Sequence, residues 1–314
     1  MQPMRRAVID VGTNSVKLLI ADVDGCHVQP LIEQSEQTRL GQGFYETQQL
    51  QAGAIASTAQ AVAGFAGLAR QAQVKDVRVI GTSAARDAIN KDELAAALQE
   101  ASGLALEIIS GEQEAEWVFR GVASDPKLHG QRLLILDVGG GSTEFILGAG
   151  VEHVFRNSFS LGSLRLLEKL RPGDPPSMED LAGCRGWLHN FFKEHVTPAL
   201  SSLLSAGDNA STCLVGTGGT VTILARMEGK MENFDRERIE GMRSSRQQLL
   251  DWMVRLWSVS LAERRKIIGL PPKRADVILT GVAIYEAVMV QVHFEEMYIS
   301  TRGLRFGAIL EKGA

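Results

Sequence analysis

The chain has 314 residues, of which 45% are hydrophobic and 22% charged, and its formal net charge is −4. That length accommodates two domains of ordinary size, and the slight acidity excludes a globally basic nucleic-acid binder. The three cysteines, Cys26, Cys184 and Cys213, are scattered with no CxxC spacing. This pattern argues against a disulfide framework or a zinc site and favours the reduced cytoplasm.

Neither a signal peptide nor a membrane span is expected. Asp10 and Lys17 interrupt the apolar stretch near the N-terminus, which is not typical of a signal peptide. Residues 52–69 are uncharged, but Ala, Gly, Ser, Thr and Gln dominate them, so the stretch is too weakly apolar for hydrocarbon. We interpret it as an alanine-rich helix of a soluble protein.

Predicted strands and helices alternate along the chain, which is typical of the α/β class with helices flanking mixed sheets. In the first half, strands are predicted near 27–36, 76–81 and 105–109, and helices near 53–73, 83–102 and 112–122. In the second half, strands are predicted near 151–159, 212–216 and 296–300, and helices near 161–170, 178–204, 219–229, 245–257 and 275–292. Asp125-Pro126 interrupts the pattern, so we expect one domain over 1–124 and a second over 125–302.

An internal repeat opens each half. The stretch AVIDVGTNSVKLLIA (7–21) aligns with LILDVGGGSTEFILG (134–148), so that Asp10 falls on Asp137 at an offset of 137 − 10 = 127 residues. Both copies are typical of a strand, a tight turn and a second strand. The repeat predicts two related domains.

Three glycine-rich or polar turns could bind phosphate. Glycine lets successive backbone N–H groups point at an anion, and hydroxyl and amide side chains add donors. The candidate phosphate-binding residues are Thr13, Asn14 and Ser15, then Gly140, Gly141, Ser142 and Thr143, then Gly218, Gly219 and Thr220. Neither a P-loop motif nor a dinucleotide fingerprint occurs in the chain. A single turn of this kind is usually only a turn, but the repetition favours an anion site.

Carboxylates at the edges of these turns are candidate metal ligands. Asp10, Asp137 and Glu144 are hard oxygen donors of the kind that suits Mg²⁺ beside phosphate oxygens. The alternative is that each aspartate only ends its strand and hydrogen-bonds its own turn.

A basic segment spans Arg226 to Arg274. It contains twelve basic and seven acidic residues, so its formal charge is +5. Arg264, Arg265 and Lys266 are its densest cluster, and we expect them to bind the distal part of a polyanion. The alternative is a set of ordinary solvated helix faces.

The motifs together resemble the exopolyphosphatase/guanosine pentaphosphate phosphohydrolase family of the sugar-kinase, heat-shock and actin superfamily. The resemblance covers essentially the whole chain and rests on IDVGTNSVKLLIA, GTSAARDA, EIISGEQEAEWVFRGV, LDVGGGSTE, SLGSLRL, GTGGTVT and LPPKRADVILTG. It implies two ribonuclease H-like (actin-like) domains around a central cleft, with a terminal helix at about 303–314 packing back on the first domain. It also implies a homodimer, and either inorganic polyphosphate or guanosine pentaphosphate as substrate.

The same resemblance implies roles for two residues. Glu114 stands where the family has a catalytic glutamate, which would act as general base toward a water. Arg86 matches an arginine that would clamp phosphate, a task that suits a guanidinium fork. Without the resemblance, Glu112, Glu114 and Glu116 would only be acids that favour a helix N-terminus.

Two positions depart from the family pattern, and other activities stay open. Gln113 replaces one of two paired glutamates, and Thr301 stands where an aspartate is common before Arg302-Gly303. A kinase that consumes ATP and a non-catalytic sensor of phosphate or nucleotide are further alternatives on the same fold.

Overall fold

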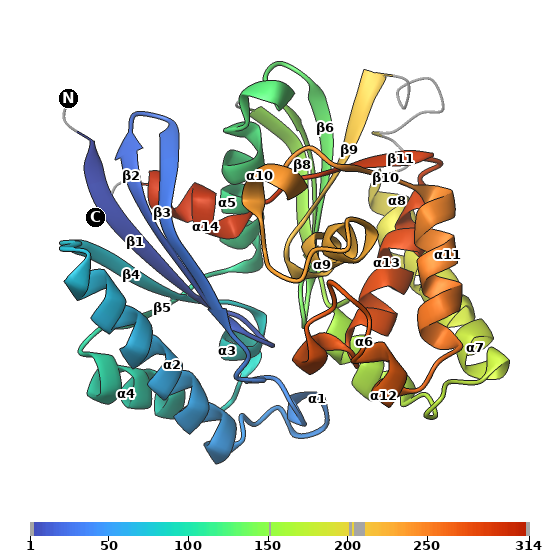
Figure 1. Cartoon of the computed structure of the whole chain (residues 1–314), viewed down its shortest axis with the longest axis horizontal. Helices are drawn as coiled ribbons and strands as arrows, with labels where there is room; N and C mark the ends of the chain where they lie inside the picture. The colour runs from blue at the N-terminus through green and yellow to red at the C-terminus, as the bar shows by residue number, and fades with distance from the viewer. Residues whose placement is uncertain (1–2, 151, 201–202, 204–210, 312–314) are drawn as a thin grey trace. The chain divides into compact units, whose positions relative to one another are not determined.

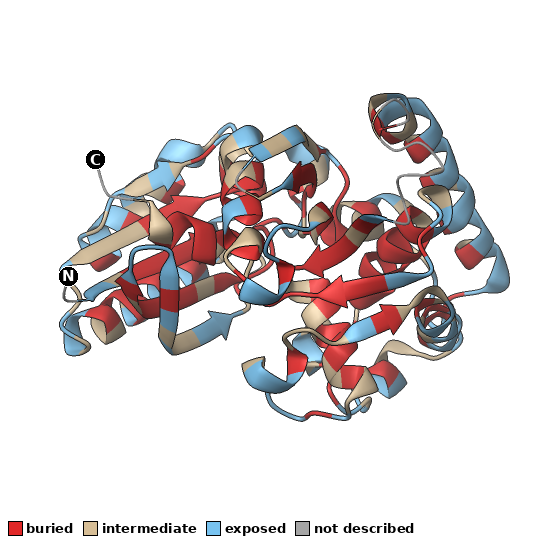
Figure 2. Ribbon diagram, turned by 90° about the horizontal axis from the view of Figure 1, so that it is seen from above, coloured by how far each residue is buried: buried red, intermediate tan, exposed pale blue. Residues whose placement is uncertain are grey.

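The computed structural model describes residues 3–150, 152–200, 203 and 211–311 (Figure 1). The chain forms two compact units. Unit 1 comprises residues 1–129, 156–158 and 302–314, and unit 2 comprises residues 130–155 and 159–301. Strands and the helix faces that pack on them form the buried interior of each unit (Figure 2).

Unit 1 is built on a five-stranded sheet of order β3-β2-β1-β4-β5. The first three strands are antiparallel, whereas β4 and β5 run parallel to β1. The strands are β1 (Met4–Val11), β2 (Val16–Asp24), β3 (His27–Glu36), β4 (Asp76–Gly81) and β5 (Leu106–Ile108).

Helices cover both faces of this sheet (Figure 1). They are α1 (Phe44–Thr47), α2 (Ala52–Gln71), α3 (Ser83–Asp87), α4 (Lys91–Ser102), α5 (Gly111–Ala123), the 3₁₀ turn Pro126–Leu128 and α14 (Leu304–Leu310). α2 packs on β1 and β2, and α14 packs on α5 and on the same two strands. Because side chains alternate along a strand, Ile9 and Leu18 join the core beneath α2 while Val8 and Leu19 are buried on the other face.

Among the described helices, α2 is the one that is long and apolar enough to meet the criteria for a membrane span, with a mean hydropathy of 1.3 over its best window. Its apolar stripe of Ile55, Val62 and Phe65 is buried against the sheet of unit 1. That packing identifies it as a core helix of this unit.

The prediction of a single helix over 83–102 is wrong, because the helical structure is interrupted between Asp87 and Lys91. Asn90 donates to the main-chain oxygen of Leu50 and accepts from its N–H at 3.1 and 2.9 Å. These tertiary hydrogen bonds pull the intervening residues out of helical geometry. The break leaves α3 as a short helix directly after β4.

Unit 2 contains a six-stranded sheet of order β10-β11-β9-β6-β7-β8. The strands are β6 (Arg132–Val138), β7 (Thr143–Ala149), β8 (Glu152–Phe159), β9 (Thr212–Thr217), β10 (Arg243–Ser245) and β11 (Glu296–Ile299). β7 is antiparallel to β6, whereas β9 is parallel to both β6 and β11. β10 is a short edge strand absent from the sequence prediction.

The helices of unit 2 gather around α13 (Ile278–Gln291), which contacts α6, α7, α9, α11 and β6. The others are α6 (Ser163–Leu170), α7 (Met178–Phe191), α8 (Thr197–Leu200), α9 (Gly219–Glu228), α10 (Arg236–Ile239), α11 (Arg246–Trp257) and α12 (Leu261–Arg264). The helix predicted over 178–204 passes through a π-helical stretch at Phe192–Val196 between α7 and α8, and its last residues lie partly outside the described ranges.

The offset-127 repeat is confirmed at the level of backbone geometry. In β1–β2 the N–H of Gly12 donates to the oxygen of Ser15 at 3.1 Å, and in β6–β7 the N–H of Gly139 donates to the oxygen of Ser142 at 3.0 Å. The strand registers also correspond, since Asp10 pairs with Lys17 and Asp137 pairs with Glu144.

Candidate active site

In unit 1 the carboxyl ends of the parallel strands meet at one edge of the sheet. Val11 lies beside Gly81, and Gly81 lies beside Ile108. Helices α3 and α5 begin immediately after β4 and β5, so their N-termini stand at this edge. Open α/β sheets bind ligands outside the carboxyl ends of such strands, where helix N-termini favour anions.

The turn between β1 and β2 places buried polar groups at that edge. Thr13, Asn14 and Ser15 are all buried, and backbone hydrogen bonds from Gly41 to Thr13 and from Arg39 to Asn14 hold the turn. Within the described chain, Asn14 Nδ2 is buried without a hydrogen-bond partner. Ser83 Oγ, in the first turn of α3, is likewise buried without a hydrogen-bond partner among the described residues. Buried polar atoms are normally paired, so this edge fits a polar ligand.

Asp10 is the penultimate residue of β1 and is 6% exposed. Its Oδ1 also lacks a hydrogen-bond partner among the described residues. Burial raises the pKa of this carboxyl, and the positive charges of Lys17 and Arg305 only partly oppose that effect. A buried oxygen with free coordination capacity suits a cation.

Arg86 and Glu114, both candidate site residues from the sequence, lie side by side in unit 1. Nη1 of Arg86 lies 3.1 Å from Oε2 of Glu114 and also donates to the main-chain oxygen of Ile109 at 3.1 Å. Glu114 lies in the N-terminal part of α5, which is capped by Ser110 through the N–H of Gln113 at 3.1 Å. The glutamate is 7% exposed, so this ion pair is largely shielded from water.

In unit 2, Asp137 and Glu144 form a pair of carboxylates. They are direct register partners on β6 and β7, so their side chains project from the same face of the sheet. Glu144 is 1% exposed. Asp137 is also the parallel partner of Thr217 on β9, which brings the second and third turns together.

Gly218 is required beside Asp137. Its φ of +90° is strained for residues with a side chain, and an added methyl group would overlap Oδ1 of Asp137. α9 starts directly afterwards with Gly219 and Thr220, and Thr220 is buried. The carboxylate of Asp137 therefore lies against the N-terminus of α9.

The glycine turn of unit 2 is held by the segment that begins α6. The N–H groups of Leu164 and Arg165 both donate to the oxygen of Gly140, at 2.9 and 3.0 Å. Nε of Arg165 donates to the oxygen of Gly141 at 2.8 Å, and Thr143 Oγ1 donates to the oxygen of Leu161. These bonds occupy the carbonyls of the turn and leave its shape fixed.

The donor set of unit 2 fits Mg²⁺. The described residues contain no cluster of three or more His, Cys, Asp or Glu side chains arranged to hold a metal. Mg²⁺ does not need one, because it is commonly held by one or two carboxylates together with phosphate oxygens and water. The Asp137–Glu144 pair matches that requirement, with Asp10 as a separate donor in unit 1.

The prediction that Arg264 belongs to a basic surface is wrong. Arg264 is 3% exposed, and its guanidinium donates to the main-chain oxygens of Ala275, Leu256 and Val259 at 2.7–3.0 Å. It turns inward at the end of α12 and joins the end of α11, the connection between α11 and α12, and the segment before α13. Burial accordingly lowers its pKa.

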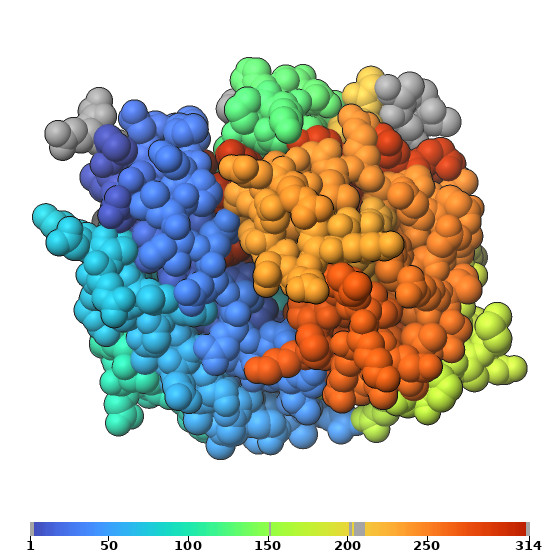
Figure 3. All heavy atoms as spheres, viewed as in Figure 1, coloured from blue at the N-terminus to red at the C-terminus, as the bar shows by residue number. Residues whose placement is uncertain are grey.

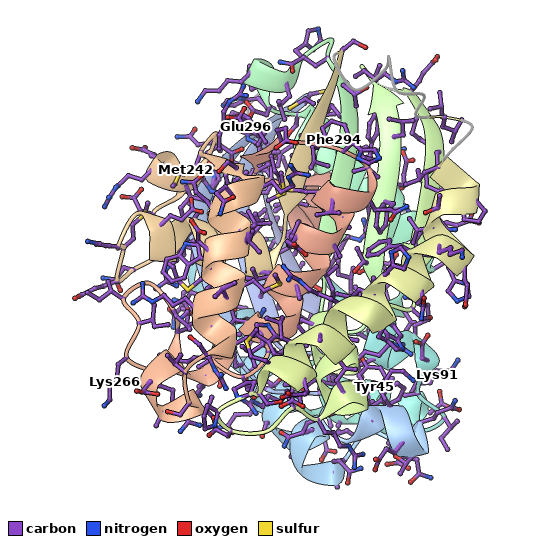
Figure 4. All side chains as sticks on the ribbon, turned by 90° about the vertical axis from the view of Figure 1, so that its right-hand side faces the viewer. Tyr45, Lys91, Met242, Lys266, Phe294 and Glu296 are labelled. Atoms are coloured by element: carbon purple, nitrogen blue, oxygen red, sulfur yellow. The ribbon has the colours of Figure 1, made fainter. Side chains whose placement is uncertain are left out.

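Its neighbours Arg265 and Lys266 are exposed. The side chain of Lys266 projects outward in Figure 4, and the segment around it forms part of the surface in Figure 3, in orange. The exposed basic residues of this part of the segment are Arg265, Lys266 and Lys273.

Two residues near the site were missed by sequence reasoning. Ser83 lay in the matched GTSAARDA motif and carries a hydroxyl, so its type was a usable signal. Tyr285 gave no such signal, because it is an aromatic residue in an apolar helix. Its buried hydroxyl donates to the main-chain oxygen of Thr217 at 2.7 Å and lies near Leu136 O at 3.3 Å, and burial together with Asp137 raises its pKa well above the usual value.

Two mixed α/β units, each opened by the same strand–turn–strand motif with a polar or glycine-rich turn, are typical of the ribonuclease H-like, actin-like fold. Proteins of this fold commonly bind phosphoryl groups at such turns. Comparison with known proteins identifies the family. The model of the Ppx/GppA phosphatase family matches residues 19–313. The chain belongs to this family and is a hydrolase of phosphoric anhydride bonds.

The similarity to known proteins covers nearly the whole chain. Exopolyphosphatase 2 of Mycobacterium tuberculosis is 34% identical over 293 residues, which cover 90% of this chain and 89% of that protein. A guanosine-5'-triphosphate,3'-diphosphate pyrophosphatase of Vibrio campbellii is 28% identical over 97% of this chain and 58% of its own length.

Solved structures agree on the fold. The crystal structure of an exopolyphosphatase from Cytophaga hutchinsonii superposes with a TM-score of 0.86 at 28% identity, covering 97% of this chain and 96% of that one. The Ppx/GppA family member from Aquifex aeolicus gives a TM-score of 0.79 at 30% identity, covering 98% and 96%.

Proposed function

We propose that the chain is a magnesium-dependent exopolyphosphatase in which Glu114 activates the attacking water. The observation that carries this proposal is the shielded Arg86–Glu114 ion pair at the carboxyl ends of β1, β4 and β5. The contact with Arg86 at 3.1 Å holds the Glu114 carboxylate in place, and a general base must be positioned within hydrogen-bond reach of the proton that it accepts.

In the reaction, the water oxygen attacks the terminal phosphorus while Glu114 accepts the water's proton. The bond between that phosphorus and the bridging oxygen breaks, and its electron pair leaves with the shortened polyphosphate. Arg86, Thr13, Asn14 and Ser15 would donate to phosphate oxygens on one side. Gly140, Gly141, Ser142, Thr143, Gly218, Gly219 and Thr220 would supply the cradle of unit 2.

Asp137, Glu144 and Asp10 would hold the cation. Mg²⁺ bound there would neutralise phosphate charge and polarise the phosphoryl oxygen. The site's own residues position the phosphate and move the proton.

Polyphosphate is favoured over guanosine pentaphosphate by two observations. The relative named exopolyphosphatase is more similar and matches over a larger share of its own length than the pyrophosphatase. Arg265, Lys266 and Lys273 also place positive charge on the surface of unit 2, where the distal part of a long polyanion could bind. Guanosine pentaphosphate is the alternative substrate. We further propose that the enzyme works in the cytoplasm as a homodimer.

The experiment is phosphate release by the purified protein with Mg²⁺ from long polyphosphate, short polyphosphate, guanosine pentaphosphate and ATP. Preference for long polyphosphate supports the proposal, and preference for guanosine pentaphosphate selects the alternative. ATP consumption with a phosphorylated acceptor would indicate a kinase. Binding without phosphate release from any substrate would indicate a sensor.

The surface role is tested with Arg265→Gln/Lys266→Gln. The KM for long polyphosphate should rise several-fold while the KM for short chains stays within about twofold. Equal effects on both lengths would contradict a distal binding surface.

A further inference from the structure

Helix α5 carries acidic residues on two faces with different surroundings. Glu112 and Glu116 are four residues apart and therefore share one face, whereas Glu114 lies two residues from each and points elsewhere. Glu114 pairs with Arg86. The face with Glu112 and Glu116 meets another arginine, Arg156 of β8.

Arg156 bridges the two glutamates of that face. Its Nη1 lies 2.8 Å from Oε2 of Glu116, and its Nη2 lies 3.8 Å from Oε2 of Glu112. Glu116 is the better shielded partner, with a side-chain exposure of 15%, while that of Glu112 is 78%. The bond to Glu116 is therefore the stronger of the two contacts, because water screens the other.

A second contact from the same strand fixes the start of the helix. Gly111, the first residue of α5, lies so close to Ser158 that an added Cβ would stand 2.7 Å from the Cβ of Ser158. The same Cβ would lie 3.9 Å from Nη2 of Arg86. Residues 156–158 group with unit 1, unlike the rest of β8. Arg156 and Ser158 thus meet successive turns of α5 on either side of Glu114.

We propose that Arg156 is a positioning residue that fixes the rotation of α5 about its axis and thereby the direction of the Glu114 carboxylate. This inference rests on the proposed role of Glu114. α14 packs on α5, with Gly307 against Trp117 and Gly121 against Gly303. The ion pair between Arg156 and Glu116 adds a contact nearer the N-terminus of α5 that opposes rotation and fraying of its first turns. A displacement of about 1 Å at a reacting group can lower a rate about 100-fold.

Arg120 provides a matched control. Its Nε lies 2.7 Å from Oε1 of the same Glu116, but Arg120 is on α5 itself, four residues further on. Removing Arg120 takes a positive charge from Glu116 and leaves the contact between α5 and β8 in place. Removing Arg156 takes the same charge and also loses that contact.

The test measures kcat, KM and thermal midpoint for Arg156→Gln, Arg156→Lys and Arg120→Gln on short polyphosphate. Arg156→Gln should lower kcat about tenfold or more, with KM within about twofold, and Arg156→Lys should recover most of the loss. Arg120→Gln should stay within about twofold of the unmodified protein. If Arg156→Gln does not fold, Glu112→Ala/Glu116→Ala takes its place, because it removes both acceptors of Arg156 and should show the same loss of kcat.

A kcat for Arg156→Gln within twofold of the unmodified protein would overturn the proposal, as would an equal loss in Arg120→Gln. A rise in KM at constant kcat would also overturn it, because Arg156 would then bind substrate. Glu114→Gln distinguishes failure of the proposed function from failure of the positioning role of Arg156. If that variant keeps full activity, the proposed function fails, whereas an essential Glu114 with an unaffected Arg156→Gln overturns only the positioning role.

Discussion

Replacing Gly218 with alanine should disable the site of unit 2 by moving a single carboxylate. Gly218 has a φ of +90°, and the new methyl group would overlap Oδ1 of Asp137. Restoring van der Waals separation requires the carboxylate or the backbone to move by about 1 Å. A shift of that size at a group that holds the phosphate or its cation costs about 100-fold in rate. The backbone strain adds about 1–3 kcal/mol to the free energy of the folded state.

Gly130→Ala separates the two effects. Gly130 is also in unit 2 and has a φ of +74°, but nothing lies within 4 Å of an added Cβ. Both variants should lose several degrees of thermal midpoint, and only Gly218→Ala should lose kcat and need more Mg²⁺ for half-maximal phosphate release. A folded Gly218→Ala variant with kcat within threefold of the unmodified protein would refute the assigned role of Asp137.

Three further outcomes follow from burial. Burial raises the pKa of Asp10 in the folded state, so the ionised carboxylate destabilises the fold above that pKa, and stability is regained as pH falls through it. Asp10→Asn should therefore raise the thermal midpoint by about 2–4 °C at pH 8 without Mg²⁺ while abolishing activity. An unchanged midpoint at both pH 8 and pH 5 would contradict this. Burial also raises the pKa of Cys184 to about 12, so a thiol reagent at pH 8 should modify the exposed Cys26 rapidly and Cys184 only on unfolding, which mass spectrometry of the labelled peptides checks. Arg264→Met should lower the thermal midpoint by about 5 °C or more by leaving three carbonyls unpaired, without changing the KM for long polyphosphate; a selective KM increase would restore Arg264 to the binding surface.

The repeated turns could be predicted because their geometry is local. A strand ending in Asp, followed by glycine and a small hydroxyl residue, specifies the same turn in both copies, with matching hydrogen bonds at Gly12 and Gly139. The pairing of Asp137 with Glu144 then follows from the register of a hairpin. The α/β class is confirmed for the same reason, since it depends on alternating local patterns.

Features that depend on tertiary contacts could not be predicted. Nothing in the basic run 264–266 indicates that Arg264 turns inward to three carbonyls, or that Asn90 breaks a predicted helix by bonding to Leu50. The consequence of Thr301 is another example. Glu240 accepts from the N–H of Thr301 at 2.8 Å and from Ser300 Oγ at 2.9 Å, so a glutamate from a separate segment places a carboxylate beside Thr301.

The most direct test of the proposed mechanism is phosphate release from polyphosphate by Glu114→Gln, measured with substrate binding in the same Mg²⁺ buffer. The isosteric amide keeps the size of the side chain and its place beside Arg86 but cannot accept the proton. The proposed mechanism predicts a loss of kcat of about 100-fold or more with binding retained within a few-fold. Phosphate release at the unmodified rate would contradict the assignment of Glu114 as the general base.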